Sequence, residues 1–154
     1  MMPTKHHAFP VRGFILALGV NAIWINASEV FRYFVFVMPM MREALPGVEN
    51  VAPMNVPIFL VWGVWDTVLL VFSTLMTTLW LAVFGSHVRQ AIAAGAAIWG
   101  GVFCIFWIAM LNMNIATPAV AGVASLFALI EMVVAALITR WALRKSSGDG
   151  LATA

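Results

Sequence analysis

The chain has 154 residues, enough for one domain, and 64% of them are hydrophobic whereas only 9% are charged. Soluble domains use roughly 45–50% apolar and 25% charged residues, so this composition excludes a water-soluble fold and predicts a lipid bilayer as the surroundings. The formal net charge of +2 comes from basic residues near the ends of apolar runs, which is typical of membrane orientation and excludes nucleic acid as an expected partner.

The first membrane span is predicted at residues 11–38, after a cytoplasmic N-terminal segment of residues 1–10. A bilayer needs roughly 20 apolar residues, and we expect the span to end before Pro39, because proline interrupts a helix. A secretory signal peptide is the alternative, since basic residues precede the apolar run and Ala27 resembles a cleavage site. The apolar run continues past Ala27, which favours the span.

Residues 39–55 contain several prolines and a glycine, so we expect an irregular outer loop there. The second span follows at residues 56–84 and ends at Gly85, a residue that commonly terminates helices. The third span, residues 90–111, comes after a turn so short that these two helices should be antiparallel neighbours.

The fourth span is predicted at residues 119–141, so that the transmembrane domain covers residues 11–145. The tail, residues 146–154, shows no periodicity and is expected to be disordered. The fold class is therefore an all-α membrane protein, a four-transmembrane-helix bundle in the N-in/C-in orientation. We expect a multi-pass protein of the cell membrane.

Four ionisable residues lie well inside the predicted spans: Glu29, Arg32, Asp66 and Glu131. A charge at the bilayer centre costs at least ~2.5–3.5 kcal/mol on insertion scales, so such residues normally face the interior of a bundle and are paired or protonated. Counting along each helix at about 1.5 Å per residue places all four near the middle of the membrane. We predict these four as the catalytic or ion-coupling residues.

One arginine can compensate only one of the three acids, so the remaining carboxyls must carry protons or meet a cation. Two structural alternatives stay open. Glu29 and Arg32 are three residues apart and can form an intrahelical ion pair that serves packing alone. The other acids can be held by hydrogen bonds from serine, threonine or tryptophan side chains.

We predict a set of ligand-binding residues from the polar and tryptophan side chains that share the spans with these charges. Deep tryptophans can form the walls of a pocket for an aromatic, lipidic or cationic ligand, and an asparagine near the outer end of the third span can close it. The predicted set is Trp24, Asn26, Ser28, Trp62, Ser73 and Asn112.

A single cysteine, Cys104, excludes an internal disulfide and a cysteine-based metal framework. The sequence also lacks a phosphate-binding glycine loop, a nucleophile elbow and a metalloprotease helix motif. We expect no metal and no cofactor.

Three hypotheses for the function follow. The first is proton- or cation-coupled transport of a small solute, which requires a homo-oligomer because four helices form a thin wall. The second is a small membrane enzyme that performs acid–base chemistry, such as isomerisation or cyclisation, on a hydrophobic substrate. The third is an accessory subunit of a membrane complex.

The orientation is testable because the extramembrane basic residues are distributed unequally. Six of them, Lys5, Arg12, Arg89, Arg140, Arg144 and Lys145, fall on one side of the predicted bundle, and only Arg42 falls on the other. By the positive-inside rule both termini are cytoplasmic. A reporter that works only in the cytoplasm should be active when fused to either end, and an inactive C-terminal fusion would contradict this topology.

Overall fold

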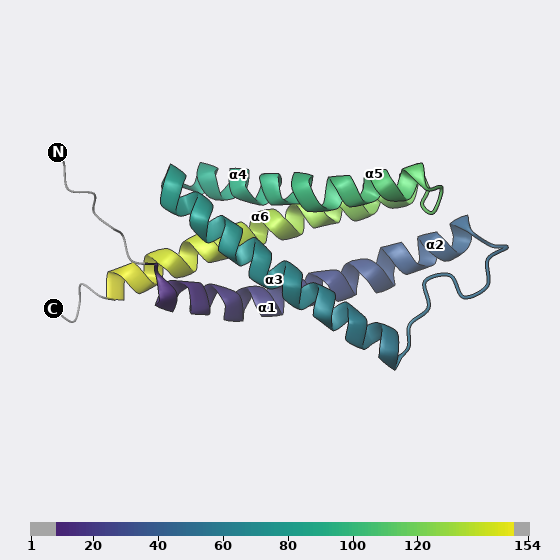
Figure 1. Ribbon diagram of the computed structural model, residues 1–154, viewed down its shortest axis with the longest axis horizontal. Coiled ribbons are helices and arrows are strands. Elements are labelled where there is room, and N and C mark those ends of the chain that lie inside the picture. Colours follow the sequence, from purple (N-terminus) through teal and green to yellow (C-terminus); the bar gives the residue numbers. More distant parts are fainter. Residues whose placement is uncertain (1–8, 150–154) are drawn as a thin grey trace.

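The computed structural model describes residues 9–149, and all the regular structure in that range is helical (Figure 1). Four helical stretches are long and apolar enough to cross a membrane: Val11–Ala44, Val56–Phe84, Val88–Asn112 and Pro118–Ser147. The predicted all-α fold with four membrane-spanning helices is therefore confirmed. Most of the predicted N-terminal segment, and residues 150–154 of the predicted tail, lie outside the described residues.

The first span consists of α1 (Val11–Arg32), a π-helical segment η1 (Tyr33–Val37) and α2 (Met38–Ala44). The prediction that Pro39 ends this helix, with an irregular loop from residue 39, is wrong, since the helix continues to Ala44. Proline lacks an N–H group and its ring collides with the carbonyl four residues earlier. The wider π-helical turn directly before α2 provides room for the ring at the start of the new segment.

The second span is α3 (Val56–Phe84), which has the predicted bounds. It begins at Asn55, whose side chain accepts a hydrogen bond from the backbone N–H of Ile58 at 3.1 Å. It ends at Gly85, which has a φ of +90° that favours glycine.

The third span contains α4 (Val88–Trp99), a second π-helical segment η2 (Gly100–Cys104) and α5 (Ile105–Asn112). The fourth span, α6 (Pro118–Asp149), extends beyond the predicted end of the membrane domain. The prediction of a disordered tail is therefore wrong for residues 146–149, because α6 continues through them.

The bundle is organised around α6, which packs most extensively against α1 and α4 and also contacts α3 and α5. Small residues allow this close approach. A Cβ atom on Gly95 of α4 would lie 2.7 Å from the Cα of Val133, and one on Gly13 of α1 would lie 2.9 Å from the Cα of Leu143. On α6 itself, the buried positions are mostly alanines: Ala121, Ala124, Ala128, Ala135, Ala136 and Ala142.

The two ends of the bundle differ. One end, here called the terminal end, holds the start of α1, the end of α6 and the turn between α3 and α4; the other, the loop end, holds the loop after α2 and the turn between α5 and α6 (Figure 1). Helix α3 crosses the bundle diagonally, and its first half diverges from α5 toward the loop end (Figure 1).

Candidate functional site

Three of the four predicted charged residues meet where α1 contacts α6. Arg32 forms an ion pair with Glu29 through its Nη2 atom, and its Nη1 atom lies 4.0 Å from Oε2 of Glu131. The same Glu131 oxygen accepts a hydrogen bond of 2.7 Å from the hydroxyl of Ser28. Glu131 is completely buried, so its contacts come from the protein alone in this state.

Asp66 completes this group from α3. It is 5% exposed, and Glu29 and Arg32 are near enough to act electrostatically on its carboxyl group. The structure thus brings together all four ionisable residues predicted from the sequence. We call Glu29, Arg32, Asp66 and Glu131 the charged cluster.

The polar atoms of the charged cluster are incompletely paired. Arg32 Nη1, Asp66 Oδ1 and Glu131 Oε1 are buried and have no hydrogen-bond partner among the described residues. Buried polar groups are nearly always hydrogen-bonded, because an unpaired one loses its hydration without compensation. One guanidinium is too little for three carboxyl groups, so the charged cluster requires protons or an additional group.

A cavity of about 430 Å³ extends from the charged cluster toward the loop end. Its walls come from the first span, the loop between α2 and α3, α3, η2 and α5, and both π-helical segments contribute to them. The lining residues are Glu29, Arg32, Tyr33, Val37, Met41, Ala52, Met54, Ile58, Trp62, Trp65, Val102, Phe103, Phe106, Trp107 and Met110. Asp66 and Glu131 are absent from this lining, and Glu131 contacts the cavity only through Arg32.

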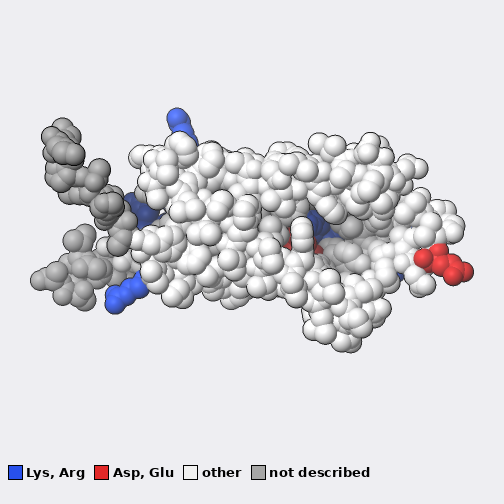
Figure 2. Space-filling view, viewed as in Figure 1, with Lys and Arg blue, Asp and Glu red and all other residues white. Residues whose placement is uncertain are grey.

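The cavity opens on the side of the bundle where α3 and α5 diverge. Figure 2 shows a hollow on this face, toward the loop end, with basic and acidic atoms visible inside it. A side opening in a membrane-spanning bundle faces lipid, so an apolar molecule can reach the cavity from the membrane.

Six of the fifteen residues that line the cavity are aromatic. The rings of Tyr33 and Trp62 are 4.9 Å apart, and the guanidinium of Arg32 lies over the ring of Phe103 at 5.4 Å from its centroid. The contact with Phe103 holds the Arg32 side chain against the cavity wall while it pairs with Glu29. Trp62, one of the predicted ligand-binding residues, therefore lines the cavity.

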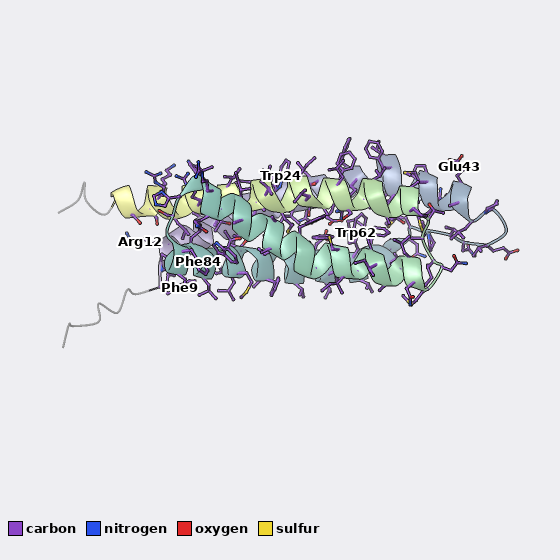
Figure 3. The ribbon with its side chains drawn as sticks, turned by 90° about the horizontal axis from the view of Figure 1, so that it is seen from above. Phe9, Arg12, Trp24, Glu43, Trp62 and Phe84 are labelled. Atoms are coloured by element: carbon purple, nitrogen blue, oxygen red, sulfur yellow. The ribbon has the colours of Figure 1, made fainter. Side chains whose placement is uncertain are left out.

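Two predicted ligand-binding residues support the charged cluster instead of lining the cavity. Trp24 donates a hydrogen bond from its indole N–H to the backbone carbonyl of Glu131 at 3.0 Å. Trp24 and Trp62 both lie midway along the bundle, whereas Glu43 and Arg12 mark its opposite ends (Figure 3). Ser28 is the hydrogen-bond donor to Glu131 described above, so both residues position that acid.

Three further predicted ligand-binding residues, Asn26, Asn112 and Ser73, do not line this cavity. Asn26 is exposed, and its side chain donates to the carbonyl of Ala22 one turn earlier at 2.7 Å. Asn112 is exposed at the end of α5 and does not line the cavity. Ser73 is buried in α3 two turns beyond Asp66, where it donates to the carbonyl of Leu70 at 3.2 Å.

A second polar layer was not predicted as part of the site. The side-chain amide of Asn21 donates to the hydroxyls of Thr74 at 3.1 Å and of Thr139 at 3.0 Å, which ties α1 to α3 and α6. All three residues are completely buried, and the side-chain carbonyl oxygen of Asn21 has no hydrogen-bond partner within the part of the chain that the structure describes. We call Asn21, Thr74 and Thr139 the amide–hydroxyl layer.

The spacing of the two layers is regular. Eight residues separate Glu29 from Asn21, Asp66 from Thr74 and Glu131 from Thr139. At about 1.5 Å per residue this is roughly 12 Å along the bundle, with the amide–hydroxyl layer nearer the terminal end. This repeated spacing was the signal in the sequence that could have found the layer.

An apolar barrier separates the two layers. It consists of Ile25, Leu69 and Met132, which are at most 4% exposed and belong to one continuous hydrophobic core. The cavity described above therefore ends at the charged cluster and does not continue along the bundle axis to the amide–hydroxyl layer.

Comparisons with protein-family models, with characterised proteins and with solved structures find no match for this chain. What the fold and site define is a multi-pass membrane protein with a buried charged cluster at the floor of an apolar cavity. The function is therefore argued from the geometry of this site.

The ion pairs within the charged cluster make a prediction about stability. Replacing Arg32 with methionine should lower the free energy of unfolding by about 3–5 kcal/mol, because it leaves the Glu29 carboxylate without its partner. Adding Glu29→Gln should restore much of the loss, since no orphan charge remains on α1. Thermal unfolding in detergent measures both effects.

The control for this pair is the double variant of Arg32→Met with Asp66→Asn, which should restore less because Asp66 makes no ion pair with Arg32. If Glu29→Gln and Asp66→Asn restored the stability of Arg32→Met equally, Arg32 would serve the charged cluster as a whole. That result would contradict the specific pairing with Glu29.

Proposed function

We propose that this protein is a proton-coupled transporter of a small amphipathic solute, which enters the cavity from the side facing lipid. The observation that carries this proposal is the charged cluster, with its unpartnered polar atoms, at the floor of an apolar cavity that opens on the side of the bundle. With the terminal end in the cytoplasm, as the basic residues predict, the cavity lies in the outward half of the bundle.

The cavity lining supports an amphipathic solute. Its walls are aromatic and aliphatic, whereas Glu29 and Arg32 supply ionised groups at the floor. A volume of about 430 Å³ suits a small molecule. An apolar body would pack against the walls, and a polar head group would reach the ion pair.

The surplus of carboxyl groups supports proton coupling. Three acids and one arginine are buried together, and the third span contributes no Asp, Glu, Lys or Arg to this part of the bundle. With all four groups ionised, two negative charges would be uncompensated in a low-dielectric interior. Protons on both Asp66 and Glu131 would remove that imbalance, and a solute that alters the charge at the floor of the cavity would favour their uptake or release.

The closed end supports transport over simple binding. The apolar barrier and the amide–hydroxyl layer continue the line of buried side chains from the charged cluster toward the terminal end. Alternating access requires such a barrier to open when the other end closes. Helices α1, α3 and α6 contribute to both layers, so a tilt of α3 against the other two would move both together.

A membrane enzyme is the second candidate, and one observation favours it. A single chain supplies the entire cavity and the whole charged cluster, so catalysis needs no oligomer. A protonated Glu131 or Asp66 would be the acid and an ionised carboxylate the base. A transporter with so thin a wall needs at least a dimer, so the mass of the assembly in nanodiscs distinguishes the two.

The transport proposal is tested with proteoliposomes that contain a pH-reporting dye and carry an imposed proton gradient. Three probes share a 4-butylbenzyl body and end in a trimethylammonium, a sulfonate or a hydroxyl group. At least one of them should accelerate proton movement over that in protein-free vesicles. Asp66→Asn and Glu131→Gln should lower this rate to the protein-free level while leaving thermal stability nearly unchanged, because each keeps the side-chain shape.

The matched control is Glu43→Gln, which neutralises an exposed carboxylate at the loop end and should transport normally. Full activity of both amide variants would mean that the buried carboxyls are structural. If no probe changes proton movement through folded wild-type protein, the transport proposal is wrong.

A further inference from the structure

The charged cluster and the cavity together also indicate which solutes would bind. We propose that the solute is a lipophilic cation, an organic ammonium group on an apolar body, with its head at Glu29 and its body between the aromatic walls. This inference rests on the proposed function and names its substrate class.

Charge balance is the first argument. The buried charged cluster has three carboxyl groups and one guanidinium, which pairs with Glu29 through Nη2, while its Nη1 lies 4.0 Å from Glu131 without a hydrogen bond among the described residues. A cation at the floor would reduce the surplus of negative charge, whereas an anion would increase it. In a low-dielectric interior this difference decides between ligands of opposite sign.

The unpartnered oxygens are the second argument. Asp66 and Glu131 are 5% and 0% exposed, and each keeps one carboxyl oxygen without a hydrogen-bond partner. Glu131 Oε2 lies 4.0 Å from Arg32, and Arg32 lines the cavity together with Glu29. A positive head beside Glu29 would stabilise these oxygens through its field without having to touch them.

The walls are the third argument. Tyr33, Trp62, Trp65 and Trp107 line the cavity, and aromatic rings attract cations through their electron-rich faces. The protein already uses this interaction once, between Arg32 and Phe103. Ammonium groups are the cations that aromatic cages recognise best, because their charge is spread over an apolar surface.

An inorganic cation fits this site less well. Metal ions require several oxygen, nitrogen or sulfur ligands around one point. The described part of the chain has no group of three His, Cys, Asp or Glu side chains arranged to hold a metal ion. The mostly apolar walls also offer few ligands to a hydrated ion.

The experiment measures binding to the full-length protein in nanodiscs. Tritiated 4-butylbenzyltrimethylammonium is displaced by itself, by the matching sulfonate, and by the neutral isostere in which carbon replaces nitrogen. The cation should bind about tenfold more tightly than its isostere, which has the same shape but no charge. Double replacement of Asp66→Asn and Glu131→Gln should reduce cation affinity and leave that of the isostere unchanged.

Two further variants keep this result specific. Ile58→Trp narrows the cavity at a partly exposed lining position and should weaken cation and isostere alike, whereas Glu43→Gln should affect neither. Equal affinities of cation and isostere would overturn the substrate class, and so would preferred binding of the sulfonate. In either case, proton movement driven by a neutral or anionic probe would leave the proposed transport function intact. If no probe drives proton movement, both the transport function and the substrate class are wrong.

Discussion

The placement of one guanidinium among three carboxyl groups, in the middle of an apolar bundle, is the constraint on which the rest of the structure depends. Isolated charges at this depth would oppose insertion of their helices. Their energetic cost falls only if α1, α3 and α6 associate so that Arg32 reaches both Glu29 and Glu131. The small residues along α6 and at Gly95 permit this association, and the charged cluster gives the helices a fixed register.

The same constraint explains why the loop-end half is hollow. Arg32 lies over Phe103 of η2 and pairs with Glu29, and directly beyond it the first span changes to a π-helical turn. The two π-helical segments face the cavity from opposite sides, while α3 diverges from α5 (Figure 1). Below the charged cluster, Ile25, Leu69 and Met132 pack without a gap of this kind. A second hollow, of about 460 Å³, lies between α3 and α4 in the terminal half, but no residue of the charged cluster lines it.

Much of this arrangement could be predicted from the sequence, because membranes impose simple rules. Uncharged runs of sufficient length defined the four spans, and the cost of burying charge identified Glu29, Arg32, Asp66 and Glu131. What failed depended on helix phase and on local backbone geometry. Asn26 lies between buried Ile25 and Glu29 in the sequence, but its side chain is exposed. The side-chain amide donates a hydrogen bond to the backbone carbonyl of Ala22. The π-helical turn before Pro39 left no recognisable pattern in the sequence, so the first span was predicted too short.

The central claim is that the charged cluster holds more carboxyl groups than its arginine can neutralise, so that at least one carries a proton when no solute is bound. Infrared spectroscopy of the reconstituted protein at neutral pH tests this directly, because a protonated carboxyl has a C=O stretch that a carboxylate lacks. The account predicts such a band in the wild-type protein and in Glu43→Gln, and its loss when Asp66→Asn and Glu131→Gln are combined. Absence of the band from the wild-type protein would mean that all three acids are ionised and would contradict the account.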